Sequence, residues 1–236
     1  MRGKGSIAIA GRIRGQRVNL LSFLIGGAFV LLMYSSVAAT IIAGSVTGGR
    51  AFDLGAQFSK LSAPLGNAFG PVNSVGNNTF QNQNLLGFDE KQDIDPIDFL
   101  NLGLGISLPI NIQSLASHYI FYDPVPQTTL LGSIEFANTI VAVITARTAL
   151  ISSEALGDPS VTYLYPGFVG LEFRDRVTFQ GNTAFLDWRA GTPGDYIRVI
   201  TAELQTSTPE PNTFILLSLG IVGLGLCRKR RKQRES

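Results

Sequence analysis

The chain has 236 residues, a formal net charge of +2, one histidine and one cysteine, Cys227. A single cysteine excludes an intramolecular disulfide and a thiolate metal site, so the fold must be stabilised by burial of apolar side chains. Residues 40–212 hold 8 basic and 16 acidic residues, a net charge of −8, and the remaining basic residues gather at the two ends. A nucleic-acid-binding protein needs its basic residues on the folded surface. We therefore expect no nucleic-acid partner.

Residues 1–39 have the layout of a signal peptide. Five basic residues within positions 1–17 precede the apolar run LLSFLIGGAFVLLM at 20–33. A helix of these 14 residues would be about 21 Å long. This length is short of the ~30 Å hydrocarbon core of a bilayer, but it suits the hydrophobic region of a signal peptide. The pattern predicts export by the secretion machinery.

Small residues follow this apolar run, as signal peptidase requires. Val37 and Ala39 occupy the positions −3 and −1 of a cleavage site after Ala39. Cleavage after Ala38, with Ser36 at −3, is the close alternative. The other interpretation is an uncleaved membrane anchor.

The exported domain is predicted to begin with a loop-rich segment over residues 40–104. Its first part is rich in glycine, serine and asparagine and has little periodicity, which indicates loops with one or two short strands. The acidic stretch GFDEKQDIDPIDF follows at 87–99. Clustered carboxylates suit Ca²⁺, which binds oxygen ligands, although an EF-hand glycine is missing. We assign no metal and no cofactor, and keep calcium as an alternative for Asp89, Asp93, Asp95 and Asp98, beside Glu90.

Short β-rich runs recur between turn residues from position 105 onward. In the run at 194–204, Ile197 and Val199 alternate with Tyr196 and Arg198, the period of a strand. Such spacing predicts a mainly β domain over 40–205, folded as a jelly-roll-like antiparallel β-sandwich. Residues 147–156 fit a helical turn or a strand equally well. The predicted strands lie at 105–112, 117–124, 131–137, 140–146, 161–167, 168–173, 176–182, 183–188 and 194–204.

A second apolar run of 14 residues, Thr213–Leu226, is followed directly by basic residues. The run is apolar on every face, so it would need burial all round, and we predict a short hydrophobic helix in the membrane. The positive-inside rule places the basic residues at both ends of the chain in the cytoplasm and the acidic middle outside. The basic cluster consists of Arg228, Lys229, Arg230, Arg231, Lys232 and Arg234.

Residues 206–236 resemble the PEP-CTERM sorting signal. Pro209, Glu210 and Pro211 form its tripeptide, and the hydrophobic segment and the arginine-rich cluster follow in the same order. The resemblance implies processing by exosortase, a membrane-embedded enzyme similar to cysteine transpeptidases, in Gram-negative bacteria that make exopolysaccharide. Residues 84–202 also resemble the β-rich central domain common in PEP-CTERM proteins, through NLLGFDEKQ, SHYIFYDP, GLEFRD and GDYIRVIT. These sequence segments support the predicted fold and the predicted export, but no activity is known for them.

No catalytic constellation stands out in the exported segment. His118 follows Ser117 inside a predicted strand, and no G-x-S-x-G elbow occurs, so we interpret this histidine as structural. Paired carboxylates could serve a glycosidase, but their separation cannot be read from sequence. Aromatic residues could stack on sugars, although strands favour them for core packing. These are Tyr119, Phe121, Tyr122, Tyr163, Tyr165, Phe168 and Trp188.

The sequence therefore predicts a non-enzymatic protein of the cell surface or the exopolysaccharide matrix. The precursor would associate transiently with the inner membrane, and its partners would be signal peptidase, exosortase and exopolysaccharide. The alternative is an extracellular carbohydrate-binding module or carbohydrate-active enzyme. A tail retained as a permanent anchor is a further alternative to processing.

Overall fold

The computed structural model describes residues 39–167 and 169–204. The predicted signal helix and the predicted C-terminal hydrophobic helix lie outside this range. Within the described ranges, no helix is both long enough and apolar enough to cross a membrane.

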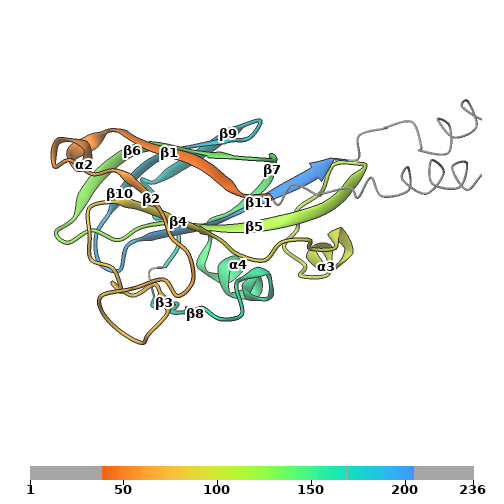
Figure 1. The fold of residues 1–236 in the computed structure, drawn as a ribbon, viewed down its shortest axis with the longest axis horizontal. Helices are drawn as coiled ribbons and strands as arrows, with labels where there is room; N and C mark the ends of the chain where they lie inside the picture. Colours follow the sequence, from red (N-terminus) through yellow and green to blue (C-terminus); the bar gives the residue numbers. More distant parts are fainter. Residues whose placement is uncertain (1–38, 168, 205–236) are drawn as a thin grey trace, which may run out of the picture. The chain divides into compact units, whose positions relative to one another are not determined.

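Two sheets form the framework of the described chain (Figure 1). The four-stranded sheet has the order β1-β6-β10-β9 and is antiparallel throughout. The five-stranded sheet has the order β2-β4-β5-β11-β7 and is antiparallel except for the β2–β4 pair. A short parallel pair, β3–β8, is separate. The elements are β1 (Ile41–Gly48), α2 (Gly49–Asp53), β2 (Phe58–Lys60), β3 (Ser74–Val75), β4 (Leu85–Asp89), α3 (Pro96–Leu100), β5 (Ile112–Tyr122), β6 (Thr128–Phe136), β7 (Thr139–Ile144), α4 (Arg147–Ser152), a 3₁₀ turn (Glu154–Leu156), β8 (Thr162–Tyr163), β9 (Arg176–Gln180), β10 (Thr183–Ala190) and β11 (Asp195–Leu204).

The five-stranded sheet is buried on both of its faces. On one face, Ile120 of β5 and Ile197 of β11 share an apolar cluster with Trp188 of the four-stranded sheet. We call this the inter-sheet cluster. On the other face, Tyr119 and Tyr196 of the same two strands belong to a second cluster, which we call the helix-side cluster. Because both faces are covered, successive residues of β5 and β11 are buried instead of alternating with exposed ones.

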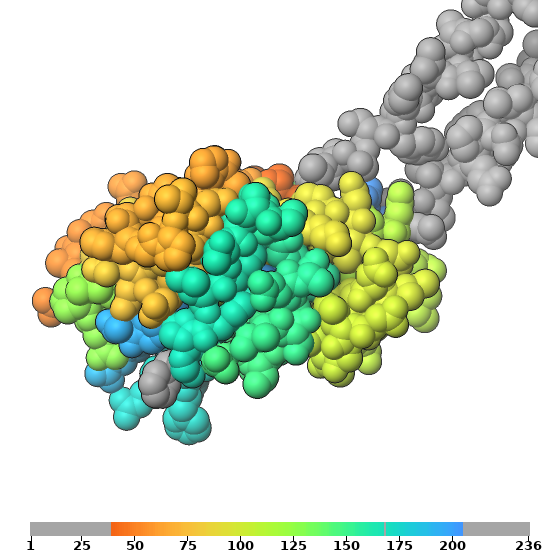
Figure 2. All heavy atoms as spheres, turned by 90° about the horizontal axis from the view of Figure 1, so that it is seen from below, coloured from red at the N-terminus to blue at the C-terminus, as the bar shows by residue number. Residues whose placement is uncertain are grey.

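Segments distant in sequence cover the helix-side cluster. Figure 2 shows residues near 60–80 (orange), the α4 region (green) and residues near 90–112 (yellow-green) side by side on one face. Their apolar side chains complete the cluster: Val75 comes from β3, Phe99 from α3 and Leu150 from α4. Asp95 starts α3 by accepting a hydrogen bond from the Ile97 amide at 2.8 Å, as N-cap residues do.

The prediction of a mainly β fold with antiparallel sheets is confirmed. The predicted runs at 117–124, 131–137, 140–146, 176–182, 183–188 and 194–204 overlap β5, β6, β7, β9, β10 and β11, with bounds that differ by up to five residues. The jelly-roll arrangement stays a prediction.

Three strand predictions were wrong in whole or in part. Residues 105–111 form a loop, because Pro109 cannot donate to a ladder and Gly105 has a φ of +69°. Within the run at 161–167 only Thr162–Tyr163 is a strand, and 169–173 contains no strand.

The loop-rich start holds more regular structure than we expected. Residues 40–104 contain β1, β2, β3 and β4, and β1 alone spans 8 residues. Two register shifts in the β1–β6 ladder interrupt the alternation of buried and exposed residues in β1, and this hid the strand from a periodicity argument. The undecided segment 147–156 is helical, as α4 and the 3₁₀ turn.

Candidate functional sites

A fully buried ion pair lies between the five-stranded sheet and α4. Arg198 of β11 points to the helix-side cluster, on the face opposite Ile197 and Val199. Its Nε donates to Glu90 Oε2 at 2.7 Å and its Nη2 donates to Glu90 Oε1 at 2.8 Å. Both side chains are fully buried. This is a bidentate ion pair in a dry environment, which fixes the geometry of both partners.

The remaining donors of Arg198 bind the end of α4. Its Nη1 donates to the Ser153 carbonyl oxygen at 2.8 Å, to Ser153 Oγ at 2.7 Å and to the Leu150 carbonyl oxygen at 3.2 Å. The guanidinium carbon lies 5.3 Å from the ring centroids of both Tyr119 and Tyr163, within cation–π range. Burial alone lowers the pKa of Arg198, but the Glu90 carboxylate holds that pKa well above its ordinary value.

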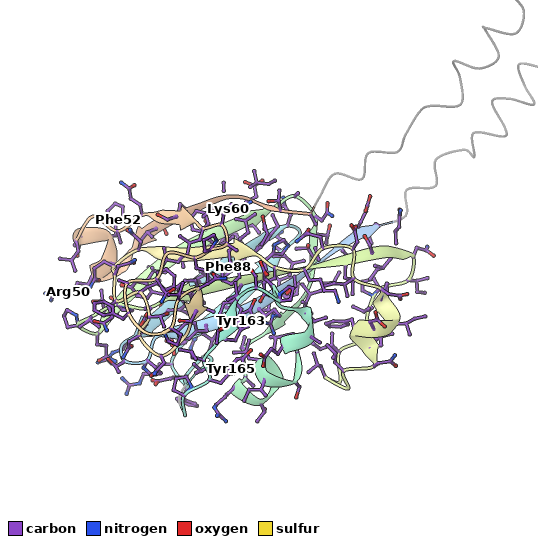
Figure 3. The ribbon with its side chains drawn as sticks, turned by 60° about the horizontal axis from the view of Figure 1, so that its bottom comes forward. Arg50, Phe52, Lys60, Phe88, Tyr163 and Tyr165 are labelled. Carbon is purple, nitrogen blue, oxygen red and sulfur yellow. The ribbon has the colours of Figure 1, made fainter. Side chains whose placement is uncertain are left out.

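This buried pair connects parts of the fold and has no open side for a substrate. Ser117 Oγ donates a further hydrogen bond to Glu90. Tyr163 stacks between Phe88 and Tyr165, with centroid distances of 6.5 and 6.4 Å (Figure 3). Ser117, one of the two residues considered for a hydrolytic site, is therefore a buried partner of this ion pair.

A second polar cluster surrounds Asp89 at the end of β4. Its carboxylate accepts hydrogen bonds from Thr40 Oγ1 at 2.6 Å and from the Ile41 amide at 2.8 Å. Lys60 Nζ lies 2.6 Å from Asp89 Oδ2, and His118 Nδ1 lies 2.8 Å from Asp89 Oδ1. Burial alone raises the pKa of Asp89, but these hydrogen bonds hold the pKa well below its ordinary value.

His118 is a buried strand residue, as expected. Its second ring nitrogen, Nε2, lies 3.0 Å from Thr201 Oγ1 on β11, and its ring packs on Phe136 with centroids 4.8 Å apart. Both imidazole nitrogens are therefore engaged in the structure.

The four aspartates kept as calcium candidates do not come together as one site. The Asp89 carboxylate is paired with Lys60 and His118, and Asp95 caps α3. Asp98 lies in the first turn of α3, and Asp93 lies in the preceding turn with a φ of +52°. Across residues 39–167 and 169–204, no three histidine, cysteine or acidic side chains come together in a way that could hold a metal ion. Asp89 and Asp95 instead accept hydrogen bonds that belong to the fold.

Most of the aromatic side chains proposed for sugar stacking pack in the core. Tyr119, Phe121, Tyr122 and Trp188 are all buried, which confirms the core-packing interpretation for them. Tyr165 is partly exposed. Phe168 lies outside the described residues.

A polar pocket of about 220 Å³ opens near the end of β10. Asp175 shapes it: its Oδ1 accepts from the Arg189 amide at 2.7 Å and its Oδ2 accepts from the Glu172 amide at 2.9 Å. The lining presents guanidinium, carboxylate and amide groups to one space, which suits a ligand with many hydroxyl groups. The lining residues are Gln127, Glu172, Arg174, Asp175 and Arg189. Sequence reasoning missed this pocket, although three of these residues belong to the segment GLEFRD at 170–175.

Asp195 lies at the start of β11 and is 3% exposed. Burial, followed by the charges of Asp175 and Glu172, raises the pKa of Asp195 to about 8. Its Oδ2 has no hydrogen-bond partner among the described residues. A buried carboxyl group of this kind is favoured in its neutral form.

The predicted sorting residues Pro209, Glu210 and Pro211 and the basic cluster at 228–234 lie outside the described residues, as does Val37. Ala39 is described, and it is half-buried just before β1. Whether signal peptidase cleaves after Ala39 stays a prediction.

Comparison with known families matches residues 207–231 to the family described as the PEP-CTERM protein-sorting motif. The match includes the predicted tripeptide, the whole apolar run and the first part of the basic cluster. No curated protein and no solved structure gives a significant match to the chain.

Proposed function

We propose that this chain, whose residues 207–231 match the PEP-CTERM protein-sorting motif, is sorted as a PEP-CTERM protein and that its exported domain has a non-enzymatic role on the cell surface or in an exopolysaccharide matrix. The motif indicates exosortase as the processing partner, a membrane-associated precursor and an extracellular or surface-bound mature form. The structural or interaction role of the mature domain is the part that we propose.

The chemistry of the motif supports processing at Pro209-Glu210-Pro211. The two prolines exclude regular helix or strand and favour an extended chain, which a protease-like active site can accept. The apolar run at 213–226 is shorter than an ordinary membrane span. Such a segment would hold the precursor in the bilayer while exosortase acts.

The burial of the chemistry-bearing side chains supports a non-enzymatic role. His118 and Ser117 are buried and hydrogen-bonded, and Arg198 and Glu90 neutralise each other. A catalytic group needs access to its substrate and a free proton-transfer atom. These side chains instead stabilise the contacts of the five-stranded sheet.

Processing is tested by expressing the precursor in an exosortase-positive host and in the matching deletion strain. We expect a shorter, surface-located protein only in the first strain, and mass spectrometry should find a C-terminus near Pro211. Replacement of Pro209, Glu210 and Pro211 by alanine should abolish the shortening. The matched control is Gln205→Ala with Thr206→Ala, which lies just outside the matched motif. Equal size and location in both strains would contradict the sorting step.

The polar pocket supports carbohydrate binding as a second candidate function. Arg174 and Arg189 bring guanidinium donors next to the carboxylate acceptors of Glu172 and Asp175, and hydroxyl groups can bond to both kinds. Titration of the purified protein with exopolysaccharide fragments tests this function. Arg189→Ala should lose binding, and Arg176→Ala on the neighbouring exposed strand should retain it. Release of reducing sugar would identify an enzyme, whereas binding without release would identify a binding module.

A further inference from the structure

Four aliphatic side chains are exposed at one end of the described domain. Ile97 and Leu100 of α3 are 65% and 50% exposed, Ile110 is 87% exposed and Leu204 is 46% exposed. Leu204 pairs with Ile112, two residues after Ile110, and α3 packs on β5. Figure 1 shows α3, the start of β5 and the end of β11 together at this end. We call this region the α3 end.

One continuous segment of the α3 end carries no charge, although Asp98 of α3 and Glu203 of β11 lie next to it. Residues 99–117 contain no acidic and no basic residue, although the domain as a whole is acidic. Leu102, Leu104, Ile106 and Leu108 alternate along the loop and pack partly buried against the helix-side cluster. This packing holds the loop against the domain. The exposed side chain of Ile110 therefore extends from a backbone that is fixed by its neighbours.

The chain leaves the domain at this same end. Only residues 205–212 separate Leu204 from the apolar run at 213–226. Eight extended residues span at most about 29 Å. In a precursor whose apolar run lies in the bilayer, the α3 end is therefore kept close to the membrane surface. Exposed aliphatic side chains in that position gain free energy by entering the boundary between headgroups and acyl chains.

We propose that the α3 end of the membrane-held precursor binds the lipid bilayer, with Ile97, Leu100 and Ile110 inserted at the interface. This inference rests on the proposed function, because it needs the apolar run in a membrane. Asp93, Asp95 and Asp98 lie beside the inserted residues and would be repelled by anionic headgroups. The lipid surface that fits is therefore zwitterionic.

Quenching by brominated acyl chains tests the proposal on the full-length precursor. In a Cys227→Ser background, Ile110→Cys is labelled with a fluorophore and the protein is reconstituted in phosphatidylcholine vesicles. The matched control is Val72→Cys, because Val72 is 89% exposed but lies near β3, away from the α3 end. We expect quenching at position 110 to exceed that at position 72 at least threefold, and to weaken in phosphatidylglycerol vesicles at low salt.

Equal quenching at the two positions, absence of quenching at 110, or stronger quenching in the anionic vesicles overturns the proposal. Flotation of the vesicles separates this failure from that of the proposed function. A precursor that floats with the vesicles without quenching at 110 overturns the lipid contact alone. A precursor that does not float overturns the membrane-held state and the lipid contact with it. If the fluorophore at position 110 becomes shielded from solvent only after exosortase is added, the surface binds that enzyme and the lipid contact is overturned.

Discussion

Removal of one partner of the buried ion pair should strongly destabilise the fold. Glu90→Gln leaves the Arg198 guanidinium in a fully buried position without its counter-ion, and Arg198→Met leaves the Glu90 carboxylate unpaired. Breaking a buried pair on one side costs about 3–5 kcal/mol. Total stabilities of ~5–15 kcal/mol are usual for domains. Either single variant should therefore lose a large part of its free energy of unfolding.

A double-mutant cycle measures how much of this loss belongs to the pair. The double variant Glu90→Gln with Arg198→Met buries no net charge, so its loss should fall short of the sum of the single losses by roughly 2 kcal/mol. Urea unfolding can be followed by the fluorescence of Trp188, the only tryptophan, which is buried in the inter-sheet cluster.

Arg176→Met on the exposed edge strand β9 is the matched control for the loss of an arginine. It should change the free energy of unfolding by less than about 0.5 kcal/mol. Single losses below about 1 kcal/mol, or additive losses in the double variant, would refute the reasoning.

Three further variants test other parts of the fold. The pKa of Asp195 is raised from 3.8 to about 8, so the folded state binds this proton more tightly and stability falls as pH rises between these values; Asp195→Asn should match the wild type at pH 4 and exceed it by about a few kcal/mol at pH 9 in urea unfolding. Burial alone raises the pKa of Asp89, but hydrogen bonds hold it below 3.8, so its contribution is present above that pH and is lost in acid; Asp89→Asn should lower the urea midpoint at pH 7 and bring the two proteins closer together at pH 2, and an unchanged difference would contradict this. Gly76→Ala would place Cβ 2.1 Å from the Leu164 carbonyl oxygen at a φ of +100°, and should lower Tm far more than Gly66→Ala, where the φ is +65° and the space is open; similar Tm values would refute the clash.

The strands that were predicted well from the sequence are bounded by turn-forming residues and have apolar or β-branched residues at their centres. β10 is the clearest case, because its buried and exposed residues alternate along its whole length. β11 was located correctly from the alternation of Arg198 with Ile197 and Val199, but this period does not tell which sides of the strand are buried. Both sides are buried, because α4 and its neighbours cover the second face.

The candidate sites were harder to predict than the strands. The acidic run around Asp89 looked like a possible ion site, but its members serve a helix cap and an ion pair with Lys60. The pocket near Arg189 combines residues from three separate segments, so no single segment reveals it. A polar residue between apolar neighbours in a strand, as with Arg198, was the one available signal of a buried charge.

The sequence by itself determined the sorting signal. Its tripeptide, apolar run and basic cluster are contiguous, and each acts through local properties: backbone restriction, hydrophobicity and charge. Only the tertiary structure decided the fate of Glu90 and Arg198, which are 108 residues apart in the chain. Their contact depends on the order of β4, β5 and β11 in one sheet and on the packing of α4 over it. Contacts of this kind follow from strand order and register, which are properties of the whole fold and of no single segment.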